Sequence, residues 1–202
     1  TSDGVPVVFH DDTTDRLTGQ PGSVESRTIG ELHDLRVRGQ SIPTLATVVA
    51  ALDEVATRQN RELLINVELK PTGSPAPLVQ AAIPILAPWL EPGRISLTVS
   101  SFDPRVLMEA LNTGWPLAFL YEEKDALSFL PGLEVSGRRL ALHPRFDLVD
   151  AEHLAALDGR TIRTWTVDDP EVAFTCAQLG VDTIISNDPA ALLRGLKERR
   201  AS

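Results

Sequence analysis

Two short segments combine apolar residues with side chains that can do chemistry. Residues 4–11 read GVPVVFHD and contain His10, an imidazole that can accept and donate protons near neutral pH. Residues 66–70 read NVELK and place Glu68 and Lys70 two positions apart, on one face of a predicted strand. A charge in a core is costly unless it is paired or bound to a metal ion. We therefore expect an active site where these segments meet.

Each of these residues also has a structural explanation. His10 could be a histidine satisfied at a strand end, and Glu68 with Lys70 could be an internal ion pair that selects no substrate. Their place at the carboxyl end of a strand favours function, because barrel enzymes gather their sites there. Arg16, in the loop after His10, could reach a phosphate, but a solvated loop charge is the safer expectation.

Composition limits the classes of protein to consider. The chain has 202 residues, 43% of them hydrophobic, with a formal net charge of −9, and we expect one globular domain over residues 1–202. It has no apolar run of membrane-spanning length, and its acidity argues against nucleic-acid binding. The single cysteine, Cys176, excludes an internal disulfide and is expected to be buried in a helix. The sequence does not determine the cellular compartment, and the cytoplasm is taken only as a default.

The first half of the chain predicts an irregular start followed by regular elements. Residues 13–27 are polar, lack any period and predict a long loop. Thr28 and Glu31 have capping-box spacing, which predicts a short helix through Leu35. We further expect a helix over residues 44–57, a strand over 63–69 and an irregular helix over 76–90.

The second half repeats a unit of about 22 residues. Strand-like runs begin near Ile95, Leu117, Arg139, Thr161 and Asp182. Asp103, Asp169 and Asp188 each precede a proline, the pattern of a helix start. This spacing predicts βα units and a parallel sheet. With the strand at residues 63–69, six strands are predicted, which fits an eight-stranded barrel lacking two strands or an open six-stranded sheet.

Other residues are weaker candidates. Ser101 ends a strand, where it could bind substrate or simply cap a helix, and Trp165 could line a pocket or pack in the core. His143 ends a strand and could contact substrate, although we assign it no catalytic role. His33 and His153 lie on amphipathic helical stretches and are expected at the surface.

Seven segments, in order, resemble the glycerophosphodiester phosphodiesterase family. They are DGVPVVFHDDTTDRLTGQPG, TIGELHDL, IPTLATVV, NVELK, SSFDP, RTWTVDDPE and GVDTIISNDPAALL. The resemblance implies an α/β fold, the (β/α)8 TIM barrel, and metal-dependent hydrolysis of glycerophosphodiesters to glycerol 3-phosphate and an alcohol, a reaction of lipid metabolism. It implies Mg²⁺ or Ca²⁺ as the cofactor.

The resemblance also implies roles for individual residues. His10 would be a general acid/base, Glu68 a metal ligand and Lys70 a phosphate contact. Trp165 would line the substrate pocket, and we add Ser101 as a substrate-binding residue.

The chain also departs from the family pattern. The family's His-Arg-Gly strand, its Pro-Glu-Asn loop and a strand carrying a Glu and an Asp do not occur in these residues. We therefore expect an N-terminally truncated barrel lacking its first two strands, with one catalytic histidine and two metal carboxylates absent. Residues 5–10 would be the returning half of a hairpin, and the open barrel edge would favour self-association. Asn187 stands where many members have Asp.

Three functions are therefore compared. The first is the phosphodiesterase acting on a small-molecule substrate. The second is an inactive barrel fragment that binds a phosphate-bearing ligand or a partner. The third is a related lipase with the same barrel that cleaves phospholipids. The sequence leaves the head group, the cation and the oligomeric state undetermined.

Overall fold

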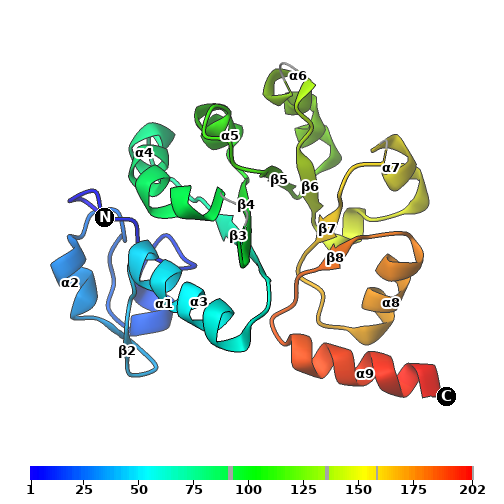
Figure 1. Cartoon of the computed structure of the whole chain (residues 1–202), viewed down its shortest axis with the longest axis horizontal. Helices are drawn as coiled ribbons and strands as arrows, with labels where there is room; N and C mark the ends of the chain where they lie inside the picture. The colour runs from blue at the N-terminus through cyan, green and yellow to red at the C-terminus, as the bar shows by residue number, and fades with distance from the viewer. Residues whose placement is uncertain (91–92, 135–136, 158, 202) are drawn as a thin grey trace. The chain divides into compact units, whose positions relative to one another are not determined.

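The computed structural model describes residues 1–90, 93–134, 137–157 and 159–201, in which helices and strands alternate along the chain (Figure 1). Its contacts divide the chain into two compact units. Unit 1 comprises Thr1–Val99 and Glu109–Trp115, and unit 2 comprises Ser100–Met108 and Pro116–Ser202. Among the described helices, none has the length and apolar character needed to cross a bilayer.

The described part of unit 1 contains a small antiparallel ribbon, several helical segments and the first strands of the parallel sheet. The elements are α1 (Asp15–Thr18), α2 (Ile29–His33), β1 (Arg36–Val37), β2 (Gln40–Ser41), α3 (Leu45–Gln59), β3 (Leu63–Glu68), α4 (Pro75–Leu86), η1 (Ala87–Leu90) and β4 (Ile95–Ser101), whose last two residues belong to unit 2. The helix, strand and irregular helix predicted over residues 44–90 are thereby confirmed.

Local capping explains where the helices of unit 1 begin and end. The hydroxyl of Thr28 accepts from the backbone N–H of Glu31, and the Glu31 carboxylate accepts from the backbone N–H of Thr28, which completes the predicted capping box. Thr44 caps α3 in the same way, through the N–H of Thr47. Asn60 ends α3 in the left-handed conformation at φ 47°.

The segment over residues 5–10 does not form the predicted strand. Its only bridge among the described residues is the antiparallel pair Val7–Thr44, flanked by hydrogen bonds from Val8 N to Pro43 O at 2.9 Å and from Leu45 N to Pro6 O at 2.8 Å. Pro6 and Pro43 have no N–H to extend the ladder. Packing holds the segment instead, because Val7 and Phe9 contact the buried cluster of Leu32, Leu35 and Ile42.

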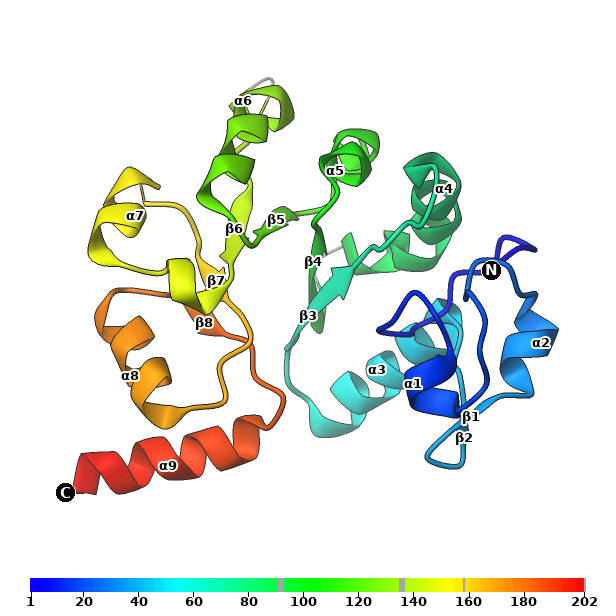
Figure 2. The same ribbon diagram turned by 180° about the vertical axis from the view of Figure 1, so that it is seen from behind.

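The polar stretch over residues 13–27 is more ordered than the loop we expected. It contains the four-residue helix α1 and an antiparallel bridge between Thr13 and Ser23. The side chain of Thr14 is buried and donates to the carbonyl of Gln20. Figure 2 shows α1 beside the β1–β2 ribbon. Short-range side-chain bonds therefore fold a segment in which the sequence shows no hydrophobic period.

Unit 2 continues the alternation of strands and helices. Its elements are α5 (Pro104–Ala110, which ends in unit 1), β5 (Leu117–Tyr121), η2 (Lys124–Phe129), α6 (Leu130–Leu133), β6 (Ala141–Pro144), η4 (Phe146–Leu148), α7 (Ala151–Ala156), β7 (Arg163–Thr164), α8 (Pro170–Gln178), β8 (Thr183–Ile184) and α9 (Pro189–Ala201). All six predicted strands are present, and the three predicted prolines open α5, α8 and α9.

The strands of unit 2 pair in parallel and in chain order. β5 pairs with β6, with Leu120 opposite His143, and β7 pairs with β8, with Arg163 opposite Thr183. Two parallel bridges, Leu142–Ile162 and Arg145–Trp165, connect β6 to β7. Sequential parallel pairing is the arrangement that βα units give, so the predicted parallel sheet is confirmed.

The helices of unit 2 pack through small buried side chains. Val167, which lies between β7 and α8, forms a buried cluster with Ala173 on α8 and Leu192 on α9, and α8 lies beside α9 (Figure 2). The guanidinium of Arg199 stacks over the Phe174 ring at 4.0 Å. Cys176 is buried in α8, as predicted. His153 is only 4% exposed, so its predicted surface position is wrong, whereas His33 is exposed as predicted.

Candidate functional site

Lys70 joins the two segments that the sequence selected. Its Nζ donates to the backbone carbonyl of His10 at 2.9 Å and lies 3.9 Å from Oε1 of Glu68. The three residues belong to unit 1. Lys70 and the backbone of His10, which are 60 positions apart in sequence, are thereby neighbours in space, and Glu68 lies beside Lys70.

Glu68 and Lys70 are not buried, which corrects the expectation that they lie in a core. Their side chains are 31% and 37% exposed. Burial alternates along β3, with residues 64, 66 and 68 on the exposed face. Leu69, only 4% exposed, holds the chain against unit 1 directly after the strand. Glu68 and Lys70 therefore stay accessible to a ligand, while the buried side chain of Leu69 fixes the segment between them.

His10 presents its ring to solvent and is held from one side. The ring is 78% exposed, and Nδ1 lies 2.7 Å from Oδ1 of Asp11. Arg16, on α1, reaches the same carboxylate with two donors, Nε to Oδ2 and Nη2 to Oδ1, both at 2.7 Å. The Arg16 guanidinium, and after it the His10 ring, hold the pKa of the Asp11 carboxyl well below its usual range.

Sequence reasoning missed Asp11 and left Arg16 as a loop charge. The signal that could have found them is the pattern His-Asp-x-x-x-x-Arg at residues 10–16, in which one carboxylate follows the histidine and one cation can turn back to it. The turn depends on α1, which ends at Gly19 with φ 73°. The fold of the loop therefore determines that Arg16 meets Asp11.

The remaining candidates, Ser101 and Trp165, belong to unit 2. The Ser101 hydroxyl accepts from the N–H of Asp103 at 3.1 Å, and Asp103 in turn accepts from the N–H of Arg105. Asp103, not Ser101, therefore bonds the first turn of α5. The indole Nε1 of Trp165 donates to the carbonyl of His143 at 2.8 Å.

An aromatic neighbour accompanies Trp165. The Phe102 ring meets the Trp165 ring edge to face, with centroids 5.2 Å apart. Phe102 is 39% exposed, so the pair keeps an apolar surface at the carboxyl ends of β4 and β7. This arrangement fits both an apolar wall for a ligand and plain packing.

A divalent cation was expected, and the described residues supply only part of a site for it. Nowhere in the described ranges do three His, Cys, Asp or Glu side chains lie close enough to share an ion. Glu68 offers one carboxylate, and its neighbour is the Lys70 ammonium. Because Mg²⁺ and Ca²⁺ take about six to eight oxygen ligands, the described residues do not by themselves fit the ion.

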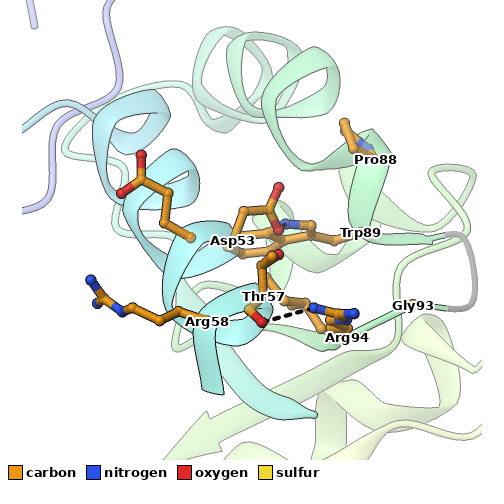
Figure 3. Close-up of a pocket in the computed structure, with 9 residues that line it drawn as sticks. Asp53, Thr57, Arg58, Pro88, Trp89, Gly93 and Arg94 are labelled. Atoms are coloured by element: carbon orange, nitrogen blue, oxygen red, sulfur yellow. Dashed lines mark hydrogen bonds between the residues drawn. The ribbon is translucent and has the colours of Figure 1, made fainter. Parts of the chain in front are cut away.

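A cavity of about 630 Å³ lies elsewhere in unit 1, between α3, η1 and the start of β4 (Figure 3). In it the Trp89 indole donates to Asp53 at 3.1 Å, and Arg94 donates to the carbonyl of Thr57 at 3.0 Å. These contacts tie the end of α3 to the amino end of β4. Barrel sites form at the carboxyl ends of strands, so we assign this cavity a structural role.

Comparison with known proteins gives a consistent result. A family model described as "Glycerophosphoryl diester phosphodiesterase family" matches residues 1–191. A glycerophosphodiester phosphodiesterase of Caldanaerobacter subterraneus subsp. tengcongensis is 26% identical over 220 residues, covering 96% of this chain and 81% of the relative. A probable glycerophosphodiester phosphodiesterase 2 of Mycobacterium tuberculosis is 29% identical over 209 residues, covering 96% and 75%.

Solved structures show the same fold. An Oleispira antarctica phosphodiesterase, in complex with the product sn-glycerol-3-phosphate, matches with a TM-score of 0.83 at 22% identity, covering 98% of this chain and 81% of that one. A putative glycerophosphodiester phosphodiesterase from Galdieria sulphuraria matches with a TM-score of 0.79 at 23% identity, covering 97% and 82%. The predicted α/β fold of the TIM-barrel type is confirmed.

Proposed function

Because the chain belongs to the glycerophosphoryl diester phosphodiesterase family, and is by that membership a phosphoric diester hydrolase, we propose that it cleaves glycerophosphodiesters to glycerol 3-phosphate and an alcohol by general acid/base catalysis. The observation that carries the proposal is the bond from Lys70 to the His10 carbonyl, with Glu68 at 3.9 Å. It ties the cation, with a carboxylate beside it, to the backbone of the segment that carries the proton-transfer histidine.

The proposed roles follow from the chemistry of each side chain. Cleavage needs a group that moves a proton to or from the reacting oxygens, and the exposed imidazole of His10 can do so. The phosphodiester carries a negative charge, which the Lys70 ammonium would attract. The bond to the His10 carbonyl would hold that ammonium beside the histidine segment. In unit 2, Trp165 and Ser101 are proposed as substrate-binding residues.

Divalent-cation dependence is proposed separately. Glu68 would be one oxygen ligand of Mg²⁺ or Ca²⁺, and such an ion would neutralise charge on the phosphate oxygens. Because the described residues do not complete a site, we route no step of the reaction through the ion. A chelator titration followed by re-addition of each cation tests this dependence.

Release of glycerol 3-phosphate tests the activity. The chain is incubated with glycerophosphocholine or with intact phosphatidylcholine, with EDTA, Mg²⁺ or Ca²⁺, beside an N-terminally extended version that carries the family's His-Arg-Gly and Glu/Asp segments. Glycerol 3-phosphate released from glycerophosphocholine alone supports the phosphodiesterase, and choline or phosphocholine released from the phospholipid, measured in parallel, supports the lipase. Binding of glycerol 3-phosphate without turnover by either protein supports the non-catalytic alternative.

Lys70 offers a sharper test with a matched control. Lys70→Met removes the cation near Glu68, and we expect KM for glycerophosphocholine to rise about 10- to 150-fold, since a charge-assisted contact is worth about 1.5–3 kcal/mol. Lys124→Met removes another half-exposed lysine that pairs with a carboxylate, Asp150. An equal change in KM in both variants contradicts the role of Lys70.

Trp165 and Ser101 are tested by the same assay. Trp165→Ala is expected to raise KM more than Trp165→Phe, because Phe keeps an apolar ring beside Phe102. Ser101→Ala is expected to raise KM without changing the cation requirement. Loss of folding, followed by circular dichroism, would point instead to packing.

Self-association is also proposed. Leu64 on β3 is 77% exposed, and a large apolar side chain on an exposed strand face is a surface that a second copy could cover. Light scattering after size exclusion measures the mass. A monodisperse monomer at all concentrations contradicts this proposal.

A further inference from the structure

The hydrogen bonds around His10 determine which of its nitrogens carries the proton. Asp11 accepts both donors of the Arg16 fork and also lies 2.7 Å from Nδ1 of His10. An ionised carboxylate only accepts hydrogen bonds. The hydrogen in the contact between Nδ1 and Asp11 must therefore belong to the ring. In the neutral ring this leaves Nε2 without a hydrogen and free to take one.

Arg16 fixes the position of that carboxylate. Its Nε and Nη2 bind the two oxygens of Asp11 separately, the paired geometry that makes Arg–carboxylate contacts directional. The Asp11 side chain is 19% exposed, whereas the Arg16 side chain is 64% exposed. With two of its donors on Asp11, Arg16 points toward the histidine segment. This favours a supporting role over a direct phosphate contact.

We propose that Asp11 is a positioning residue that holds His10 in the Nδ1–H tautomer, with Nε2 as the proton-transfer atom, and that Arg16 holds Asp11 in place. In catalysis Nε2 would gain a proton while Nδ1–H stays bonded to Asp11, so the ring would keep its orientation through the proton transfer. This kinetic consequence rests on the proposed function. The tautomer itself does not, and it can be measured without substrate.

A second arginine–aspartate pair of similar geometry serves as a control, because it is a surface salt bridge that touches no histidine in the part of the chain that the structure describes. Arg105 binds Asp103 with Nε at 3.0 Å to Oδ1 and with Nη2 at 2.7 Å to Oδ2, and its side chain is 65% exposed. Both pairs are solvent-accessible, a class of ion pair that contributes little to stability. Only the Asp11 pair contacts a histidine ring among the described residues. Arg105→Ala is therefore the matched control for Arg16→Ala.

Long-range ¹H–¹⁵N spectra of histidine-labelled protein at pH 8.5 measure the tautomer directly. We expect His10 to show the Nδ1–H pattern in the wild-type chain. His33, an exposed ring, is expected to show the Nε2–H pattern that free histidine prefers. Asp11→Ala should convert His10 to the His33 pattern. Arg16→Ala should convert part of the His10 signal to that pattern, and Arg16→Lys should convert a smaller part. Arg105→Ala should leave the His10 signal unchanged. His10→Asn assigns the signal.

Two results would overturn the proposal: a wild-type His10 pattern like that of His33, or a pattern unchanged in Asp11→Ala. The kinetic arm expects Asp11→Ala to lower kcat/KM about 10–100-fold, the range for groups that orient a functional histidine, with KM nearly unchanged. Absence of hydrolysis with an Nδ1–H signal rejects the proposed function and leaves the positioning role. Hydrolysis with an Nε2–H signal rejects the positioning role alone.

Discussion

Two histidines, one in each unit, each have an aspartate within three positions in the sequence, and their surroundings are opposite. His10 has an adjacent aspartate and an arginine, and its ring is 78% exposed. His153 on α7 is 4% exposed, and its Nε2 lies 2.9 Å from the hydroxyl of Tyr121. Asp150 is near His153, but it accepts from the backbone N–H at 2.7 Å and caps α7.

Burial decides what each arrangement can do. Desolvation lowers the pKa of His153 and raises the pKa of the Tyr121 phenol, so both groups stay neutral and bonded to each other near pH 7. Asp150 pairs with Lys124 at the surface, away from any reactive role. His10 instead meets solvent with one nitrogen held. A histidine thus forms a structural contact in unit 2 and a candidate proton-transfer group in unit 1.

The largest expected difference is in activity. His10→Asn should lower kcat/KM by about 10²–10⁴, the usual contribution of a general acid or base, with little change in the thermal midpoint because the ring is exposed. His153→Asn should keep the turnover of the folded protein. Glycerol 3-phosphate release and thermal melts of both variants provide the check. Equal turnover of wild type and His10→Asn would contradict the proton-transfer role of His10.

Stability should show the opposite pattern. His153→Ala leaves the Tyr121 hydroxyl without this partner and opens space in a buried site, and we expect the free energy of unfolding to fall by about 2–4 kcal/mol. Tyr121→Phe should cost about 1–2 kcal/mol. Urea unfolding measures both.

The double variant gives the coupling between the two groups. If His153 and Tyr121 stabilise the fold through their shared hydrogen bond, the two single losses will not add. Full additivity, or a destabilisation by His10→Ala as large as that by His153→Ala, contradicts the assignment of His153 to structure.

A third histidine sharpens the comparison through pH. His143 is fully buried, and within the described part of the chain neither ring nitrogen has a hydrogen-bond partner. Burial, with the nearby Arg163 charge, lowers its pKa to about 3. The unfolded chain binds this proton near pH 6.5, where the folded chain does not. The free energy of unfolding should therefore fall as pH drops from 6.5 toward 3, with a slope approaching about 1.4 kcal/mol per unit.

His143→Leu removes this titration and should flatten the curve. Urea unfolding between pH 7 and pH 5 measures the slope, and His33→Gln, a change at an exposed ring, is the control. A slope unchanged in His143→Leu would show that the buried ring is protonated in the folded chain as well.

The smallest effect is expected at the surface. Lys124→Ala removes the 3.1 Å pair with Asp150, whose side chain is 55% exposed. Exposed ion pairs contribute little to stability and are screened by salt, so the thermal midpoint should shift only slightly and even less in 1 M salt. A loss as large as that of Tyr121→Phe would mean that Asp150 supports His153 by more than capping.

Much of the fold follows from local sequence signals. The six strands, the Thr28–Glu31 capping box and the prolines that open α5, α8 and α9 all appear where the sequence predicts them, because each depends on residues within one turn or one strand. Other predictions were wrong. The strand over residues 5–10 is reduced to one bridge because Pro6 and Pro43 lack an N–H. His153 and the Glu68–Lys70 pair were assigned to the surface and the core respectively, and burial depends on what packs against an element from elsewhere.

The sequence by itself determined the order of the βα units, the family, and the candidacy of His10, Glu68 and Lys70, since these depend on residue types and spacing along one chain. Tertiary structure alone decided that Lys70 binds the His10 carbonyl, that Arg16 turns back to Asp11, and that His153 is covered while His10 is not. The physical reason is that hydrogen bonds and desolvation depend on distances in space, which the chain sets only when it folds.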